Sequence, residues 1–238
     1  MKSVAVHQPN YLPWLGYFYK ISKVDLFVIQ DNVDFESGNA ESLTNRTRLK
    51  SPQGMIKLTV PVRHKTGLKK INQIQIDTNQ KWARKHLSLI TNACIHSPFF
   101  KLYFPRLESV LLSDFENLSD LNIALISLCC SCLEISTPCI LASELKISGL
   151  QKSEQLVEIC RQLDADLYLS GNGARKYNDP ALFQKNNIAL KYSSYKPPVY
   201  KQLFDGFIPG LSVLDALFNL GPQTKDLLHN EESSDSGL

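Results

Sequence analysis

The feature that most constrains this chain is a short apolar run followed at once by a stiff polar segment. Residues 4–6 are apolar without alternation, a pattern typical of a strand buried on both faces of a parallel sheet. The next segment carries polar side chains and two prolines, each of which fixes its own φ: His7, Gln8, Pro9, Asn10, Tyr11 and Pro13. Ligands of open α/β sheets bind beyond the carboxyl ends of strands, so this segment is a candidate site. The alternative is that His7 and Gln8 only cap the strand end through backbone hydrogen bonds.

Composition excludes several classes of protein. The 238 residues are 21% charged and 43% hydrophobic, as in ordinary globular domains. A formal net charge of +3 is too small to indicate nucleic-acid binding. No apolar run reaches the roughly 20 residues of a membrane span, and no signal peptide follows Lys2. We therefore expect a cytoplasmic protein without membrane insertion, with a single α/β domain over residues 1–228 and a disordered polar tail over 229–238.

Strand-like and helix-like patterns alternate at both ends of the chain. This order predicts an α/β fold with a mostly parallel, Rossmann-like sheet flanked by helices. A second buried strand ends at Gln30-Asp31-Asn32, and the middle of the chain is predicted to be helical. Three isoleucines, Ile71, Ile74 and Ile76, suggest a further strand. The expected strands after the first are 25–29, 139–142, 166–169 and 188–192, and the expected helices include 14–21, 151–163 and 211–220.

An inserted antiparallel hairpin is predicted near residues 43–62, around the turn Ser51-Pro52-Gln53-Gly54. Pairing across this turn places Leu49 opposite Ile56 and Arg48 opposite Lys57. Like charges opposed in this way are unfavourable unless water solvates them or an anion neutralises them. The basic face, which carries Arg46, Arg48, Lys50 and Lys57, is therefore either solvent-exposed or anion-binding, and the same alternatives hold for the basic loop 64–70. In the hairpin segment, Asn45 and Arg46 are nearest to Asp31 in sequence and are predicted to point into a site.

Two other groups are interpreted as structural. Trp82 and His86 are four residues apart on a predicted helix, which favours a core tryptophan beside a hydrogen-bonded histidine. The cysteines lack the paired spacing of a zinc site, so we expect buried thiols and no metal. They are Cys94, Cys129, Cys130, Cys132, Cys139 and Cys160.

A second candidate site is the turn Ser170-Gly171-Asn172-Gly173, which follows the strand expected at 166–169. Its glycines would let backbone N–H groups approach an anion, although a plain turn is an equal alternative and no P-loop lysine follows. If the strands are parallel, this turn lies at the same sheet edge as His7 and Asp31 and forms a pocket with them. Ser143 and Glu144, after the strand expected at 139–142, would then join them.

The polar residues at this edge suggest acid–base chemistry. A neutral His7 could act as a general base, with Asp31 or Glu144 fixing its tautomer. No G-x-S-x-G or H-E-x-x-H motif is present, so neither a serine nucleophile nor a metal centre is indicated, and no cofactor is identified.

The segment His7–Phe18, followed by Lys20-Ile21, resembles the N-terminal signature of the WbqC-like protein family. The resemblance covers most of residues 4–221, with its motifs in the expected order. The later motifs are Asp25–Val28 with Asp31, residues 45–50, residues 58–62, Trp82 with His86, residues 97–99, residues 168–171 with Gly173, Ala174 and Tyr177, Tyr200 with Gln202, and residues 211–215. The chain departs from the family pattern near Glu36–Glu41, where a basic or aromatic residue is more common, and this weakens any anion contact there.

The resemblance implies a bacterial cytosolic protein, since several members are encoded with O-antigen or other surface-polysaccharide functions. It suggests a transferase that modifies a nucleotide-activated amino sugar, by amide formation or by acyl or aminoacyl transfer. His7 would be the base, Asp31 its partner and Arg46 the contact to a diphosphate. The substrate-binding residues would be Gln8, Pro9, Tyr11, Asn45, Arg46, Ser143, Glu144, Ser170, Gly171, Gly173 and Tyr177.

Two other functions stay open at this stage. One is a non-catalytic protein that binds a nucleotide sugar or a partner enzyme of the same pathway. The other is nucleic-acid binding through the basic hairpin face and the 64–70 loop. The small net charge disfavours this second function.

Overall fold

The computed structural model describes residues 1–36, 38–39, 41–63, 69–147 and 149–229. The tail predicted over 229–238 lies outside the described residues apart from His229. The same holds for the basic loop 64–70, of which only Lys69 and Lys70 are described.

Five strands form one parallel sheet, which confirms the Rossmann-like prediction. β1 (Ser3–His7) lies at the centre, with β2 (Leu26–Ile29) and then β5 (Cys139–Leu141) on one side. On the other side are β6 (Leu167–Ser170) and the edge strand β7 (Ala189–Tyr192). The chain leaves β1 in one direction and later returns to its opposite flank. The order of strands therefore reverses between β1 and β6, where open α/β sheets bind ligands.

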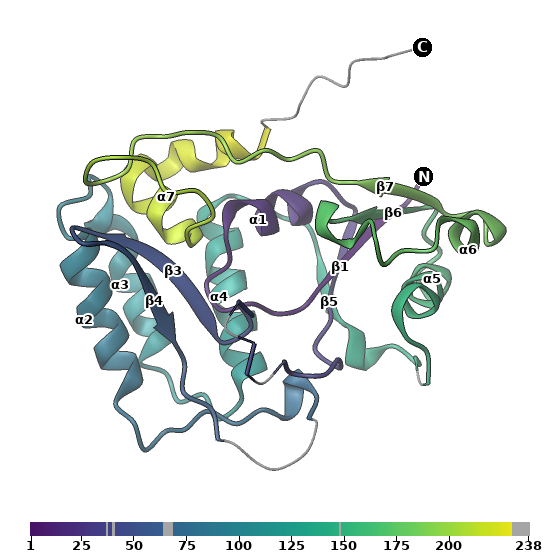
Figure 1. Cartoon of the computed structure of the whole chain (residues 1–238), viewed down its shortest axis with the longest axis horizontal. Coiled ribbons are helices and arrows are strands. Elements are labelled where there is room, and N and C mark those ends of the chain that lie inside the picture. Colours follow the sequence, from purple (N-terminus) through teal and green to yellow (C-terminus); the bar gives the residue numbers. More distant parts are fainter. Residues whose placement is uncertain (37, 40, 64–68, 148, 230–238) are drawn as a thin grey trace.

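The first strand is buried on both faces, as its apolar run predicted. Val4 and Val6 pack in one apolar cluster with residues of α5 (Lys152–Gln162) and α6 (Pro180–Lys185). Ala5 points the other way, into a larger cluster that includes α1 (Leu15–Ser22). Figure 1 shows α5 and α6 together at one end of the molecule, with α1 and the remaining helices toward the other. Alternate residues of one strand thus hold two apolar layers together.

The inserted hairpin is present in the predicted register. β3 (Arg46–Ser51) pairs with β4 (Gly54–Thr59), and Leu49 lies opposite Ile56 while Arg48 lies opposite Lys57. At the left of Figure 1 the hairpin lies with the remaining helices. These are α2 (Trp82–Cys94), α3 (Phe100–Leu111), α4 (Leu118–Cys132) and α7 (Val213–Leu220).

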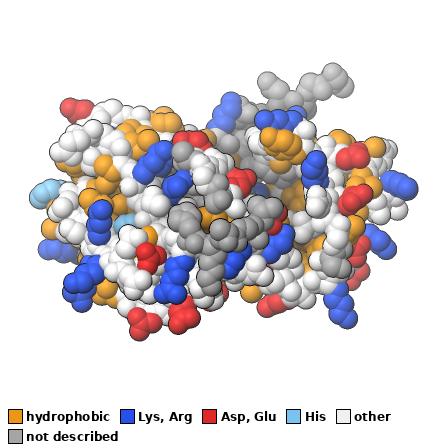
Figure 2. All heavy atoms as spheres, turned by 60° about the horizontal axis from the view of Figure 1, so that its bottom comes forward, with side chains coloured by type: hydrophobic (Ala, Val, Ile, Leu, Met, Phe, Trp, Pro, Cys, Tyr) orange, Lys and Arg blue, Asp and Glu red, His pale blue; other side chains and the backbone are white. Residues whose placement is uncertain are grey.

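The basic face of the hairpin is neutralised by the protein itself. Glu41 forms ion pairs with Arg48 and with Lys57, the latter at 3.3 Å. Lys50 is buried, and its Nζ donates a hydrogen bond to the carbonyl of Phe204 at 2.9 Å. The Glu41 carboxylate therefore offsets Arg48 and Lys57, whereas Lys50 is held by a backbone carbonyl. In Figure 2, lysine and arginine side chains alternate with acidic ones across the visible face instead of forming a basic stripe. Both observations count against the nucleic-acid hypothesis.

The prediction of a strand around three isoleucines was wrong. Ile71–Gln73 is a short 3-10 helix, η1, and Ile76 forms only an isolated bridge to Val62. The backbone N–H groups of this segment bond to separate places: that of Ile71 to Val33, and that of Ile76 to Glu116. Ile71, Ile74 and Ile76 are all buried, but Ile71 and Ile74 are three residues apart, which does not fit the period of two of a strand.

The residues interpreted as structural have mixed outcomes. Trp82 and His86 meet edge to face at 5.3 Å, and His86 is buried, as predicted. Three of the six thiols are buried as expected: Cys94, Cys129 and Cys160. Cys130 and Cys132 are half-buried, and the expectation was wrong for Cys139, which is exposed. Within the described ranges, no cluster of His, Cys, Asp or Glu is arranged to hold a metal ion. Over the same ranges, no helix is long and apolar enough to cross a membrane.

Candidate functional site

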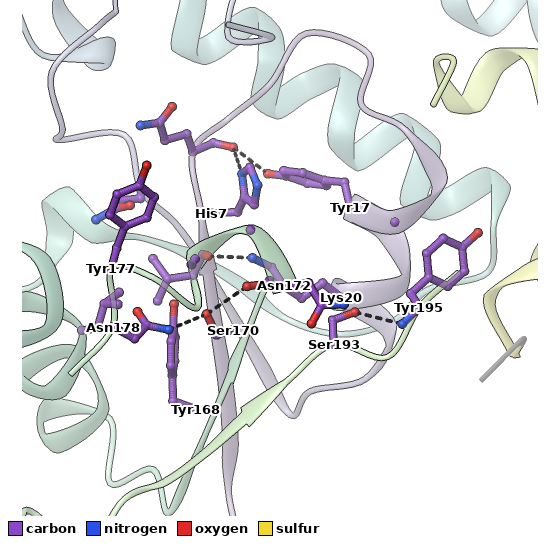
Figure 3. A pocket seen from close by; sticks show the side chains of 18 of the residues that line it. His7, Tyr17, Lys20, Tyr168, Ser170, Asn172, Tyr177, Asn178, Ser193 and Tyr195 are labelled. Carbon is purple, nitrogen blue, oxygen red and sulfur yellow. Dashed lines mark hydrogen bonds between the residues drawn. The ribbon is translucent and has the colours of Figure 1, made fainter. Parts of the chain in front are cut away.

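A cavity of about 690 Å³ lies at the carboxyl ends of β1 and β6. His7 and Gln8 line it from the end of β1, and Ser170, Gly171, Gly173 and Tyr177 line it from β6 and the segment that follows. The two candidate sites of the sequence therefore meet across one space, which Figure 3 shows from close by. His7 and Ser170 are 163 residues apart in sequence, and only the parallel pairing of β1 with β6 brings them together.

Asp31 was predicted to pair with His7, but it binds Ser143 instead. Its Oδ1 accepts a hydrogen bond from the backbone N–H of Ser143 at 2.9 Å. Its Oδ2 accepts one from the Ser143 hydroxyl at 2.6 Å and one from the amide of Asn72 at 3.2 Å. Neither Asp31 nor Ser143 is among the described residues that line the cavity. Asp31 is 2% exposed and fastens η1 and η2 (Ala142–Glu144) to the end of β2.

Five more predicted site residues serve the scaffold, and none is among the described lining residues. The Pro9 carbonyl accepts a hydrogen bond from Asn122 of α4 at 2.8 Å, and the Tyr11 hydroxyl is 2.9 Å from Nδ1 of His86. The chain turns away from the sheet edge after Gln8, so the Pro9 carbonyl faces α4 and the Tyr11 hydroxyl faces α2. The remaining contacts join the Asn45 amide to the Val60 carbonyl at 3.0 Å, Arg46 to the Asn39 carbonyl at 2.6 Å, and the exposed Glu144 to the Leu141 N–H at 3.5 Å.

His7 is held as a neutral imidazole with a defined tautomer. Its Nδ1 lies 3.1 Å from the carbonyl oxygen of Gln8, which can only accept. Nδ1 therefore carries the hydrogen, and the lone pair is on Nε2. Burial, and next the charge of Lys20, lower the pKa of His7 to about 3. The ring is fixed by edge contacts with Trp14 at 5.7 Å and Tyr17 at 4.9 Å.

Lys20 is a cavity residue to which sequence reasoning assigned no role. It lies on α1, is only 5% exposed, and donates from Nζ to the carbonyl of Val6 at 2.9 Å. Nζ also lies 6.0 Å from the centre of the Phe27 ring. Burial lowers the pKa of the Lys20 ammonium to about 7. The available signal was a lysine in the helix predicted over 14–21, within a family motif, but the periodicity did not show that this lysine faces inward.

The other walls of the cavity are aromatic or neutral polar. Aromatic rings come from Trp14, Tyr17, Tyr168, Tyr177 and Tyr195. Asn178 donates a hydrogen bond to the Ser170 hydroxyl at 2.9 Å and so orients it. The described lining residues include two lysines, Lys20 and Lys152, and no acidic side chain is among them. Such a cavity favours a ligand that combines an anionic group with flat rings.

Comparison with known proteins supports the resemblance read from the sequence. The model of the WbqC-like protein family matches residues 8–227. This chain belongs to the WbqC-like protein family. It is 36% identical over 233 residues to the uncharacterized protein Rv1507c of Mycobacterium tuberculosis strain H37Rv, an alignment that covers 96% of this chain and 98% of the relative. No solved structure is significantly similar to the chain.

The last family motifs hold the segment that closes one side of the cavity in this WbqC-like protein. The Tyr200 hydroxyl donates to the Asp215 carboxylate of α7 at 2.8 Å. The Gln202 side chain bonds to both the N–H and the carbonyl of Ile208, at 3.0 and 2.9 Å. Burial raises the pKa of Asp215 above its ordinary value. These bonds fix the chain that follows β7, which includes the cavity residue Tyr195.

Asp31→Asn tests whether this WbqC-like protein uses Asp31 in the scaffold. The variant is expected to lose about 1–3 kcal/mol of stability, because an amide cannot accept both bonds from Ser143 with the strength of a carboxylate. Urea denaturation measures the loss, and ligand affinity in the cavity should stay unchanged. Asp34→Asn is the matched control, since that carboxylate is exposed and forms an ion pair with Lys70. A loss of affinity at unchanged stability would restore Asp31 to the site.

Proposed function

We propose that this WbqC-like protein is a cytoplasmic transferase that modifies a nucleotide-activated amino sugar, by amide formation or by acyl or aminoacyl transfer, in the synthesis of bacterial surface polysaccharide. The observation that carries the proposal is the cavity at the switch point between β1 and β6, with aromatic walls, two lysines and no acidic side chain among its described lining. Its volume of about 690 Å³ falls in the range of small-molecule sites. Residues 1–228 would act as one unit.

The lining divides by chemistry into three parts. Lys152 and the turn at Gly171 and Gly173 would hold the phosphates, because they provide a cation and a backbone that an anion can approach closely. The aromatic walls would hold the base or the sugar ring by stacking. His7 would accept a hydrogen bond at Nε2 from the attacking group of the sugar and orient it, since a neutral imidazole of low pKa is a good acceptor but a weak base.

Ligand binding tests the proposal directly. We expect uridine, thymidine or guanosine diphosphate amino sugars to raise the melting temperature and to give saturable heats of binding. A ligand at 100 times its Kd should add about 2.7 kcal/mol of stability. Tyr177→Ala should weaken binding, whereas Lys225→Ala, a change at an exposed ion pair with Glu134, should not. If no nucleotide sugar shifts the melt and duplex DNA does, the proposal is wrong. Binding without turnover with any donor would favour a non-catalytic role.

His7→Ala is expected to reduce turnover by about 100-fold or more, the usual range for a group that handles a proton or orients it in the transition state. The melting temperature should change little, because His7 lies at the mouth of a cavity and its hydrogen bond is local, to Gln8. Steady-state kinetics and a thermal melt measure the two effects. His86→Ala is the control, since His86 is buried between Tyr11 and Thr59 and should lose stability first. A collapsed melt for His7→Ala would assign His7 to the scaffold.

A further inference from the structure

We propose that Lys20 is a catalytic residue of this cavity, and that its uncharged amine accepts the proton of the sugar amine that attacks the acyl donor. This inference rests on the proposed function and names the group that the reaction would need as a base. The donor would be an activated acyl compound such as a thioester or an acyl phosphate.

The position of Lys20 makes it different from a surface lysine. Helix α1 follows the polar segment after β1 and buries five consecutive residues, 17–21, of which Lys20 is the charged one. Its Nζ reaches back to the Val6 carbonyl at 2.9 Å, beside the Phe27 ring. It thus lies beneath the cavity, at the end of the central strand, while still lining the cavity wall.

No carboxylate among the described residues of the cavity offsets a charge on Lys20. Besides the lysines, the titratable groups that line the same space are His7, Tyr17, Tyr168, Tyr177 and Tyr195, of which Tyr177 is exposed. Burial lowers the pKa of His7 and raises those of Tyr17, Tyr168 and Tyr195, so these four groups are uncharged at neutral pH. The remaining cation, Lys152, is exposed at the start of α5. A buried ammonium with no counter-ion is costly, so the amine is the favoured form.

The proposed proton transfer balances. One amine hydrogen of Lys20 stays bonded to the Val6 carbonyl, and the nitrogen lone pair is free to accept. As the sugar nitrogen forms a bond to the acyl carbon, its proton moves to Lys20 Nζ, which becomes an ammonium. The bond from the acyl carbon to its leaving group then breaks. The leaving group takes the electron pair, and the proton from Lys20 restores the amine.

Competitive acetylation tests the amine without any substrate. The protein is pulsed with acetic anhydride between pH 6 and 11, and each lysine is quantified by mass spectrometry, because only uncharged amines react. Lys20 is expected to reach half of its maximal reactivity near pH 7, against about 10.4 for an ordinary lysine. Lys152, which lines the same cavity but is exposed, is the internal control. A Lys20 midpoint above pH 9.5, or a Lys20 that never reacts, would overturn the proposal.

A second measurement separates this proposal from the proposed function. Binding of an anionic nucleotide sugar should stabilise the charged form of Lys20, so the wild type should take up protons on binding at pH 7. The control Lys225→Met, a change at the exposed ion pair with Glu134, should do the same. Titration calorimetry in buffers of different ionisation enthalpy measures this uptake. Lys20→Met should still bind without proton uptake, and its kcat should fall about 100-fold or more. Unchanged proton uptake and kcat in Lys20→Met would refute the role of Lys20. A wild type that binds no nucleotide sugar would refute the proposed function, whereas the acetylation result would still stand.

Discussion

Replacing Lys20 by methionine is expected to stabilise the protein at pH 7 while it removes activity. The wild-type chain buries an amine whose pKa falls from an ordinary 10.5 to about 7. The difference corresponds to roughly 3–5 kcal/mol of unfavourable burial, at about 1.36 kcal/mol per pH unit. Methionine fills a similar volume without this cost but loses the hydrogen bond to the Val6 carbonyl, worth about 1 kcal/mol. A net gain of about 2–4 kcal/mol at pH 7 should follow, measured by urea denaturation.

The gain should depend on pH with a defined sign. Between pH 7 and 10.5 the unfolded chain holds a proton on Lys20 that the folded chain has released. Wild-type stability therefore rises with pH across this window, and the advantage of Lys20→Met should shrink and vanish near pH 10.5. Lys152→Met is the matched control and should show no such trend, because Lys152 is exposed. If Lys20→Met is destabilised equally at pH 7 and pH 10.5, Lys20 is a structural hydrogen-bond donor only.

Gly221→Ala is expected to cost about 2–4 kcal/mol of stability, the sum of backbone strain and overpacking. Gly221 ends α7 with φ 62° and ψ −134°, a conformation that residues with a Cβ rarely adopt. A Cβ at this position would lie 2.5 to 2.6 Å from ring atoms of Phe99. The Phe99 N–H donates to the Phe218 carbonyl at 3.0 Å, which fixes the backbone, so the ring itself would have to turn away from the added Cβ. Denaturation in guanidinium chloride measures the loss.

Two companion variants separate the contributions to the Gly221→Ala effect. Gly210→Ala also has a positive φ, of +69°, but its Cβ would meet no atom within 4 Å, so it should cost only about 1 kcal/mol. In the Phe99→Leu background, Gly221→Ala should cost less than in the wild type, because the ring that it meets is gone. Equal losses for Gly221→Ala in both backgrounds would show that the steric contact with Phe99 does not matter.

Local patterns were sufficient for most of the elements. The unbroken apolar run at residues 4–6 identified the central strand, and the turn Ser51–Gly54 fixed the register of the hairpin, pair by pair. Both signals depend on residues a few positions apart, and neither needs the rest of the chain. The strand predicted around the isoleucines at 71–76 was wrong because it depended on local spacing alone. The burial of these isoleucines comes from several distant segments, which their spacing does not show.

The candidate site also has features that local sequence determines and features that depend on the tertiary structure. The sequence by itself determined which residues are polar, which turns are rich in glycine and which motifs are those of the family, and it placed His7, Gln8 and the turn at Ser170–Gly173 at strand ends. Only the tertiary structure decided that these two loops share a cavity, that Asp31 binds Ser143 instead of His7, and that Lys20 is buried without a carboxylate partner. The physical reason is that hydrogen-bond partners and burial depend on segments more than a hundred residues apart, which meet only through strand pairing and the packing of two apolar layers.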